Sequence, residues 1–317
     1  MPSQSLLMSS TRDALTPVAA LPEVFVVGAA KSGTTAIYRY FRAHPELFVS
    51  PTVKEANYMA FAGAWPPLGG PGDRRALANS AIEYAVYQDL FLGRAAGQLA
   101  ADFSPAYLYH PAAAERIAGL CPQAKIVVVL RNPIEAAFSM FAMMRRDGRE
   151  PCRGFWQAFE LSAQRQQAGW EWAWNYQGCF RYGRQLSRYL TLFPSKQLWI
   201  RPYELLAQDP ERFYADLTAF LGIRPIELAG ANPRVNAAPT HRDMLARTRP
   251  GRLLVKAARA VRRVLPPAVC EPIARRMAAP ALHLDAANRR RLAEVYRSEI
   301  FELERMLSWD LRAWLKF

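Results

Sequence analysis

The stretch Phe25-Val-Val-Gly-Ala-Ala-Lys-Ser-Gly-Thr-Thr-Ala-Ile37 joins a short apolar run to a helical pattern through a turn of small residues. The run Val24 to Val27 is typical of a buried strand, and apolar residues recur at helical spacing from Thr34 onward. Such a turn directs backbone N–H groups and the positive end of a helix dipole to one place. With Lys31 and three hydroxyls added, the stretch predicts a site for an anion of the phosphate type.

The position of the lysine separates this turn from an ordinary nucleotide loop. Gly28 and Gly33 keep the glycine spacing of the P-loop G-x-x-x-x-G-K-[ST], but Thr34 occupies the lysine position. The lysine lies inside the turn instead, which disfavours an ATPase or GTPase. The order Lys31-Ser32-Gly33-Thr34-Thr35 resembles the 5′-phosphosulfate loop of sulfotransferases that use 3′-phosphoadenosine 5′-phosphosulfate (PAPS). A glycine-rich turn without a ligand is the alternative, so further motifs are needed.

A second anion site is predicted after the next continuous apolar run, Ala124 to Leu130. Arg131 follows this strand, and Ser139 lies in the helix that Asn132 and Pro133 begin. A guanidinium at a strand end binds phosphate bidentately. Arg131 followed by Ser139 resembles the 3′-phosphate signature of PAPS-dependent sulfotransferases. Taken alone, each residue is better explained as a solvated charge or a packed hydroxyl, but together with Lys31 they are not.

The chain therefore resembles the PAPS-dependent sulfotransferase family, and its carbohydrate-type and bacterial branches in particular. The resemblance covers roughly 22–310 and is strongest over 24–60 and 124–222. It implies a P-loop-like α/β fold, with the nucleotide at the carboxyl ends of the strands, and PAPS as the sulfuryl donor with no metal required. Further matching segments are His44-Pro45, Lys54 to Tyr58, Ser104 to Tyr107, Tyr182 to Leu186, Phe193-Pro194, Arg201 to Leu205, Asp209-Pro210, Phe220 to Gly222 and Leu303 to Trp309 followed by Trp314.

The resemblance also implies roles for individual residues. Lys31 would stabilise the leaving phosphate, and Ser32, Gly33, Thr34 and Thr35 would hold it, while Arg131 and Ser139 would bind the 3′-phosphate. Glu55 matches the glutamate that serves as base in the glycosaminoglycan branch, and Lys54 beside it would tune its pKa. Asp102 and His110 are lesser candidates with structural explanations.

Two departures from the family pattern concern basic contacts. Phe103 stands where many relatives have a lysine, and a late Lys-Gly-Arg element has no clear match. The segment Val235 to Arg242 resembles the one that bacterial relatives place there, so Arg242 is a weak candidate for cofactor binding.

Composition limits the partners and the location. A net charge of +14 and an isoelectric point near 10.0 favour anionic partners. The four cysteines, Cys121, Cys152, Cys179 and Cys270, form no C-x-x-C pair, so we expect free thiols and no metal site. Neither a signal peptide nor a membrane anchor is indicated in the first 22 residues, which predicts a cytoplasmic protein.

Alternating strands and helices predict one parallel sheet covered on both faces. We expect strands at 24–27, 46–50, 98–103, 124–130 and 197–201, and helices at 36–43, 82–92, 111–120, 133–144, 154–168, 178–192 and 210–221. The predicted organisation is a flexible arm at 1–21 and a single sulfotransferase domain at 22–317. The part from about 242 to 317 is predicted to be helical and basic.

Two segments are candidates for contact with an acceptor or a surface. Trp170 and Trp174 are predicted to share a helix face and to form a platform for a sugar or lipid, unless they pack in the core. The amphipathic basic segment 252–265 is a candidate for peripheral membrane contact, although a solvated surface helix is the preferred explanation. The acceptor class stays open among a sugar hydroxyl, which we prefer, a lipid and a small natural product.

Two rival functions stay open from the sequence alone. An ATP-dependent kinase or other P-loop phosphotransferase would need Mg²⁺ and a differently placed lysine. A basic nucleic-acid-binding module would need one basic stripe with exposed aromatic residues, whereas the basic residues here are spread through the C-terminal helices. We therefore expect no nucleic-acid partner.

Overall fold

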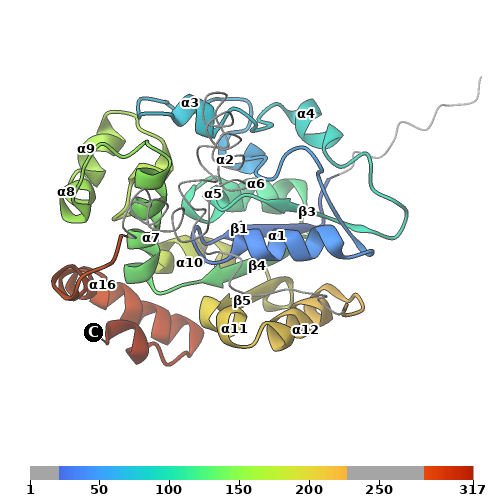
Figure 1. Cartoon of the computed structure of the whole chain (residues 1–317). Coiled ribbons are helices and arrows are strands. Elements are labelled where there is room, and N and C mark those ends of the chain that lie inside the picture. The colour runs from blue at the N-terminus through green and yellow to red at the C-terminus, as the bar shows by residue number, and fades with distance from the viewer. Residues whose placement is uncertain (1–20, 227–281, 317) are drawn as a thin grey trace, which may run out of the picture.

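The computed structural model describes residues 21–226 and 282–316 and contains a sheet of five strands in the order β2-β3-β1-β4-β5 (Figure 1). Every neighbouring pair of strands is parallel. The strands are β1 (Val24–Gly28), β2 (Leu47–Val49), β3 (Leu99–Phe103), β4 (Lys125–Leu130) and β5 (Leu198–Pro202). All five predicted strands are thereby confirmed, as is the α/β class. β1 lies at the centre, so the loop that follows it opens at the middle of the sheet's carboxyl edge.

The side chains of β1 alternate between two hydrophobic cores, one on each face of the sheet. Val24 and Val26 pack into one core, and Phe25 and Val27 pack into the other. All four are fully buried. A strand covered on both faces is apolar at every position, which explains the continuous run in the sequence.

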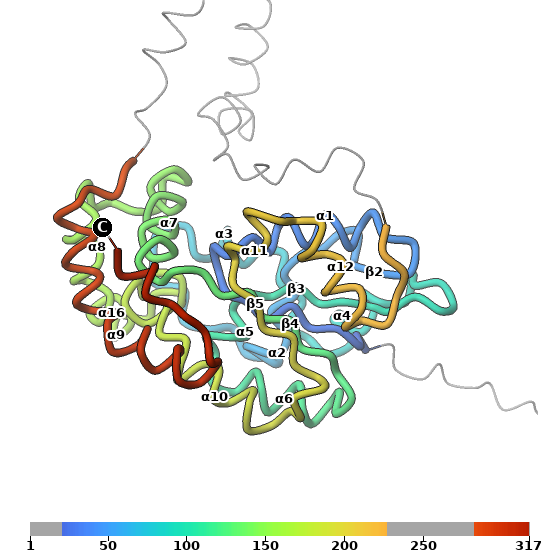
Figure 2. Tube along the Cα trace, turned by 90° about the horizontal axis from the view of Figure 1, so that it is seen from below, coloured from blue at the N-terminus to red at the C-terminus, as the bar shows by residue number. Residues whose placement is uncertain are grey.

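The two cores are covered by different helices (Figure 2). One face carries α1 (Thr34–Ala43), α11 (Tyr203–Gln208) and α12 (Pro210–Leu221). The opposite face carries α5 (Ala106–Tyr109), α6 (Ala113–Leu120), α7 (Pro133–Arg146), α10 (Tyr182–Leu192) and α16 (Ala286–Leu307). α16 packs against α7 and α10, so the described end of the chain joins the second core.

Shorter helices complete the described part of the chain. They are α2 (Tyr58–Phe61), α3 (Asp73–Ala76), α4 (Tyr84–Asp89), α8 (Phe155–Glu160) and α9 (Ser162–Gln167), with 3₁₀ turns η1 (Trp172–Trp174), η2 (Ser195–Gln197) and η4 (Arg312–Leu315). None of the helices within 21–226 and 282–316 has the length and apolar character needed to cross a bilayer.

Capping residues set two helix starts, and the first of them is predicted by the sequence. The Asn132 side chain accepts a hydrogen bond from the Ile134 N–H, and Pro133 occupies the first turn of α7. Asp209 accepts from the Arg212 N–H at the start of α12, again with proline following.

Other expectations need correction. The helix predicted over 154–168 is interrupted between α8 and α9, the one over 178–192 begins only at Tyr182, and the one over 82–92 is restricted to α4. Trp170 and Trp174 do not share a helix face, because η1 contains only Trp172–Trp174. Arg242 and the segment 252–265 lie outside the described residues. The single-domain organisation stays a prediction.

Candidate active site

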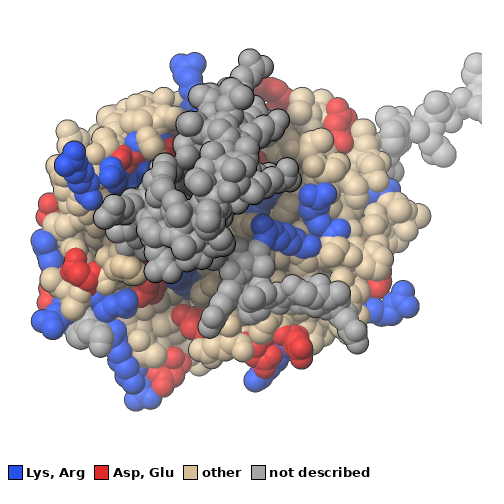
Figure 3. Space-filling model, in the orientation of Figure 1, with Lys and Arg blue, Asp and Glu red and all other residues tan. Residues whose placement is uncertain are grey.

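Three loops meet at the carboxyl edge of the sheet, because β3, β1 and β4 are neighbours. The loop after β1 contains Lys31, the loop after β3 begins at Ser104, and Arg131 follows β4. In open parallel sheets this edge, at the point where the strand order reverses, is where ligands bind. Exposed Lys and Arg side chains also gather over α1 on the face shown in Figure 3.

The loop after β1 has a backbone that needs a glycine at Gly33. Gly33 has a φ of 83° and precedes the first residue of α1. A Cβ atom there would lie 2.7 Å from Cδ2 of Leu206 and 3.1 Å from Cε2 of Tyr203. α11 therefore presses against this turn, and only a residue without a side chain lets the N-terminus of α1 face the loop.

Lys31 lies among other cations. Its Nζ donates to Sδ of Met143 at 3.4 Å, and no ion pair joins it to a carboxylate in the described part of the chain. Burial first, and then the nearby charges of Arg146, Arg131 and Lys54, lower the pKa of Lys31 to about 8, and only Asp147 opposes them. An anion beside a partly desolvated cluster of positive charge of this kind is stabilised by it.

One face of α7 is turned toward this cluster. Ser139, Met143 and Arg146 lie four and three residues apart, which places them on the same side of a helix. Met143 contacts Lys31, and the charge of Arg146 acts on Lys31. Ser139, predicted as a 3′-phosphate ligand, therefore belongs to the face of α7 that borders the loop. Arg146 was not singled out from the sequence, although its spacing of seven residues from Ser139 contains the signal.

Arg131 links the loop after β1 to the loop after β4. Its Nη1 donates to the Lys31 carbonyl oxygen at 3.1 Å, and its guanidinium lies 5.0 Å from the centre of the Tyr203 ring. The structure thus brings Arg131 to Lys31, as the sequence predicts. Tyr203 was missed as a neighbour, because nothing in the sequence indicates that α11 would lie under both Gly33 and Arg131.

Residues from the end of the chain support the loop after β4. Trp314 accepts a hydrogen bond on its carbonyl oxygen from Asn132 at 2.9 Å, and its indole N–H donates to Glu204 at 3.1 Å. Burial raises the pKa of Glu204, and the charge of Arg131 opposes that rise. Trp314 thus connects the loop after β4 to α11.

The buried hydroxyl groups of Ser32 and Tyr182 lie beside each other, and neither makes a well-aligned hydrogen bond with any described residue. Ser32 follows Lys31 directly in the chain. The side chains of Ser32 and Tyr182 are fully buried. Leaving a buried polar group unpaired costs about 1–3 kcal/mol. Together with the cations and the first turn of α1, these groups fit the phosphate oxygens of a nucleotide such as PAPS.

Glu55 lies beside the cluster through its neighbour Lys54. The Lys54 Nζ is 2.9 Å from Oε1 of Glu55 and 3.4 Å from Oγ1 of Thr35. The Glu55 side chain is 43% exposed, so this pair contributes little to stability. The predicted residues Lys31, Thr35 and Glu55 are therefore neighbours, with Lys54 between them.

A buried network holds the backbone of the Glu55 loop. The Asn57 N–H donates to the Ser104 hydroxyl at 3.1 Å, and Ser104 donates to Asp102 at 2.8 Å. Asp102 also accepts from Tyr87 at 2.9 Å and from Tyr107 at 2.7 Å. Burial raises the pKa of Asp102 to about 6, against the effect of these donors. Its oxygens are engaged in this network, so its role is structural, as the sequence indicates.

The described residues contain no cluster of three or more His, Cys, Asp or Glu side chains that could hold a metal ion. Cys121, Cys152 and Cys179 are buried free thiols, and Cys270 lies outside the described residues.

A model described as the sulfotransferase family matches residues 22–227. The chain belongs to the sulfotransferase family. The matched region contains β1 to β5 and all the described site residues named above except Trp314. A solved sulfotransferase from Alicyclobacillus acidocaldarius is similar over 94% of this chain and 100% of its own, with a TM-score of 0.73 and 26% identity.

Two curated sulfotransferases illustrate the similarity in sequence. The human bifunctional heparan sulfate N-deacetylase/N-sulfotransferase 3 is 27% identical over 213 residues, which are 65% of this chain and 23% of that protein. The mouse heparan sulfate glucosamine 3-O-sulfotransferase 6 is 26% identical over 207 residues, or 65% of this chain and 53% of that protein. The chain thus matches about a quarter and about half of these relatives' lengths.

Proposed function

We propose that this sulfotransferase transfers a sulfuryl group from PAPS to an acceptor hydroxyl on a carbohydrate or glycolipid. The observation that carries the proposal is the position of Lys31, which lies near Arg131, Arg146 and Lys54 at the carboxyl end of β1. Family membership supports sulfuryl transfer, and the names of the curated relatives support a sugar acceptor.

The residues divide into those that hold the donor and those that act on the acceptor. Ser32, Gly33, Thr34 and Thr35 would hold the 5′-phosphate with hydroxyl and backbone donors at the helix terminus. Arg131 and Ser139 would bind the 3′-phosphate, since guanidinium binds phosphate bidentately. Arg242, outside the described residues, is a weaker candidate for the same role.

Glu55 is the proposed base. It takes the proton of the acceptor hydroxyl while the acceptor oxygen bonds to sulfur and the bond from sulfur to the bridging phosphate oxygen breaks. Lys31 stabilises the charge that develops on that oxygen, which is the main electrostatic contribution in transfers of this kind. PAPS, when bound, supplies the sulfuryl group, and no metal is required.

A thermal-shift comparison separates this proposal from its rivals. Adenosine 3′,5′-bisphosphate at 100 times its Kd should raise Tm by about 5 °C or more. If the protein were a kinase, ATP with Mg²⁺ would raise Tm instead. If it were a nucleic-acid-binding module, an oligonucleotide would raise Tm. Stabilisation by either of these and not by the bisphosphate would overturn the proposal. A labelled-PAPS assay with sugar, lipid and small-alcohol acceptors then identifies the acceptor class.

A further inference from the structure

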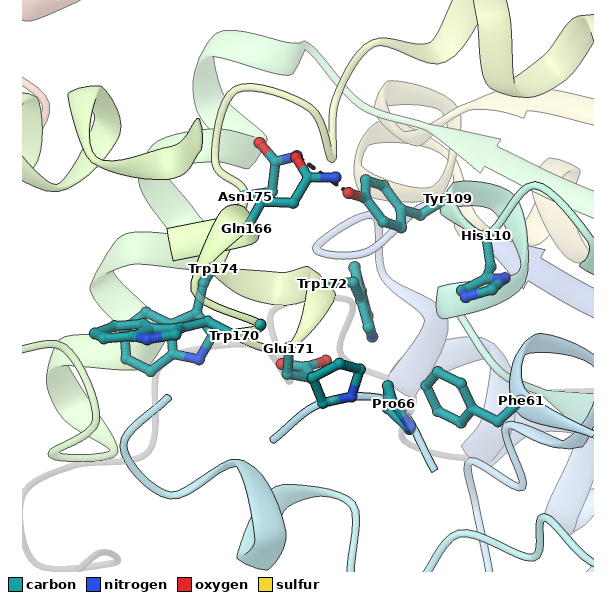
Figure 4. Close-up of a pocket in the computed structure, with 12 residues that line it drawn as sticks. Phe61, Pro66, Tyr109, His110, Gln166, Trp170, Glu171, Trp172, Trp174 and Asn175 are labelled. Atoms are coloured by element: carbon teal, nitrogen blue, oxygen red, sulfur yellow. Dashed lines mark hydrogen bonds between the residues drawn. The ribbon is translucent and has the colours of Figure 1, made fainter. Parts of the chain in front are cut away.

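A cavity of about 230 Å³ lies between the end of α2, the end of α5 and the segment that contains η1 (Figure 4). Phe61, the last residue of α2, lines it. Two loop residues and the single turn of α2 connect Glu55 to Phe61, so the two Cα atoms are at most about 15 Å apart. A short oligosaccharide spans such a distance.

The cavity is also connected to the loop after β1 through α5. Tyr109 and His110 line the cavity at the end of this helix. Leu108, one residue earlier, packs so close to Gly28 that a Cβ atom at the glycine would lie 2.9 Å from the Cβ of Leu108. The wall of the cavity and the proposed donor loop are therefore parts of one packed unit.

The three tryptophan side chains of the Trp170 to Trp174 segment have different surroundings. Trp174 is buried, donates to Asp73 at 2.7 Å, and packs edge-on against Trp170. Trp172 points instead into the space between Tyr109, His110 and Phe61 (Figure 4). Its ring centre lies 5.7 Å from that of Tyr109. All three tryptophans line the cavity, and of the three Trp172 is the one that lies between Tyr109, His110 and Phe61.

A buried carboxylate fixes the opposite wall, which contains Pro66 and Pro67. Asp73 is 1% exposed and accepts from the backbone N–H groups of Gly70 at 2.7 Å and Glu171 at 3.0 Å. Asp73 also pairs with Arg149 at 2.6 Å. The loop after α2 is thus attached to the tryptophan segment, and the cavity is preformed.

The lining combines aromatic faces with a few uncharged polar groups. The Nδ1 atom of His110 is buried without a partner among the described residues, and burial lowers the pKa of this imidazole. Gln166 and Asn175 contribute side-chain amides. No lysine or arginine is among the described residues that line the cavity. Glu171 lines it, but its carboxylate pairs with Arg149 at 3.4 Å, and burial raises its pKa to about 7. The described lining therefore offers no cation to the charge of a sulfated sugar or a uronate.

We propose that this cavity binds an uncharged sugar residue of the acceptor, next to the residue that Glu55 activates. The C–H face of a pyranose stacks on Trp172, and a hydroxyl bonds to the unpaired Nδ1 of His110, which is the combination of apolar walls and few polar groups that small-molecule sites share. Asn175 already donates to Tyr109 and Gln166 and accepts from the Gly178 N–H, so these amides shape the wall. A hydrocarbon chain would leave the His110 nitrogen unpaired. The inference rests on the proposed function only in naming the bound sugar as part of the acceptor.

The test is a calorimetric titration with defined probes. Maltose and N,N′-diacetylchitobiose should bind in the millimolar range, and a disaccharide containing glucuronic acid should bind at least about fivefold more weakly. Trp172→Ala should weaken binding of the neutral probes by about tenfold, since a base-to-aromatic stack of similar kind contributes about 1–3 kcal/mol. Trp156→Ala, which removes a half-buried tryptophan outside the cavity, should leave binding within about twofold.

His110→Phe provides a second variant that keeps an aromatic ring and removes only the polar atom. It should weaken binding of the neutral probes about threefold to tenfold, the effect of one hydrogen bond. The Tm shift with adenosine 3′,5′-bisphosphate reports separately on the donor site, so a failure of the proposed function is distinguishable from a failure here. Three outcomes would overturn the inference. The protein could bind 1-decanol but neither neutral sugar at 20 mM, it could bind the glucuronide as tightly as the neutral sugars, or both variants could bind the neutral sugars as tightly as the wild type.

Discussion

The ammonium group of Lys31 lies 3.4 Å from the thioether sulfur of Met143, a weak acceptor. This contact places the only lysine of the loop after β1 against α7 rather than against a carboxylate. The lysine is thereby held in position but its charge is not neutralised, which is the state that an incoming phosphate requires.

Binding of adenosine 3′,5′-bisphosphate should weaken as pH rises above 8. Burial lowers the pKa of Lys31 to about 8, so the ammonium loses its proton above that pH while the phosphates, with second pKa values near 6, do not change. Affinity should fall by about tenfold per pH unit above 8. Calorimetric titrations at pH 7, 8 and 9 measure this change in affinity. Lys31→Met should bind the bisphosphate weakly, and its affinity should not change with pH in this range. An equal pH dependence in that variant would show that a group other than Lys31 titrates.

Glu55→Gln should reduce turnover by about 10²–10⁴-fold, the usual contribution of a general base. Bisphosphate affinity should stay within about twofold, because Glu55 is the proposed base and not one of the proposed phosphate ligands. Turnover with labelled PAPS and a thermal shift with the bisphosphate measure the two effects. Glu83→Gln, at an exposed position, serves as the control. Near-wild-type turnover of Glu55→Gln would mean that another group takes the proton.

Gly33→Ala and Gly97→Ala make a matched pair. Both glycines have a φ of 83°, but a Cβ atom at Gly33 meets Leu206 at 2.7 Å, whereas one at Gly97 meets nothing within 4 Å. Each variant should lose about 1–2 kcal/mol of unfolding free energy from backbone strain. Gly33→Ala should lose more, and it should also bind the bisphosphate more weakly. Urea unfolding and calorimetry measure both, and equal losses in the pair would show that α11 yields to the added methyl group.

Asp102→Asn should change the pH dependence of stability between about 4 and 6. Burial raises the pKa of Asp102 from 3.8 to about 6, so the native state holds this proton more tightly than the unfolded chain does. The contribution of this proton to the free energy of unfolding is complete below pH 4 and is lost as pH rises through 6.

The asparagine variant does not titrate, so the advantage of the wild type over it should shrink across that range. Urea midpoints at pH 4.5, 5.5 and 6.5 test this, with the exposed Asp89→Asn as control. A difference that stays constant with pH would place the titrating group elsewhere.

The sheet and the loop after β1 were predictable because their signals are local. The β1 and β4 runs are apolar at every position, and the turn from Gly28 to Thr35 contains its glycines, lysine and hydroxyls in one segment. The contact between Lys31 and Arg131 could be inferred only because both follow central parallel strands.

Contacts between distant segments could not be predicted. Nothing local indicates that Tyr203 would lie under Arg131 or that Trp314 would support Asn132. The tryptophan segment was misjudged for a related reason. A helical period was assumed across Gly169 to Trp174, whereas the partners that decide which ring is accessible, Asp73 and Tyr109, lie far away in the sequence.

The alternation of β1 side chains between two cores has a consequence for how this enzyme can diversify. α1, α11 and α12 belong to one layer, while Phe61, Tyr109 and Trp172 pack on the other. The strands contribute side chains to both cores. Residues that line the aromatic cavity can therefore be exchanged without repacking α1, α11 and α12, which lie behind the phosphate loop on the other face. α7, which contacts Lys31, belongs to the cavity's layer and is the helix that a new acceptor preference would have to leave in place.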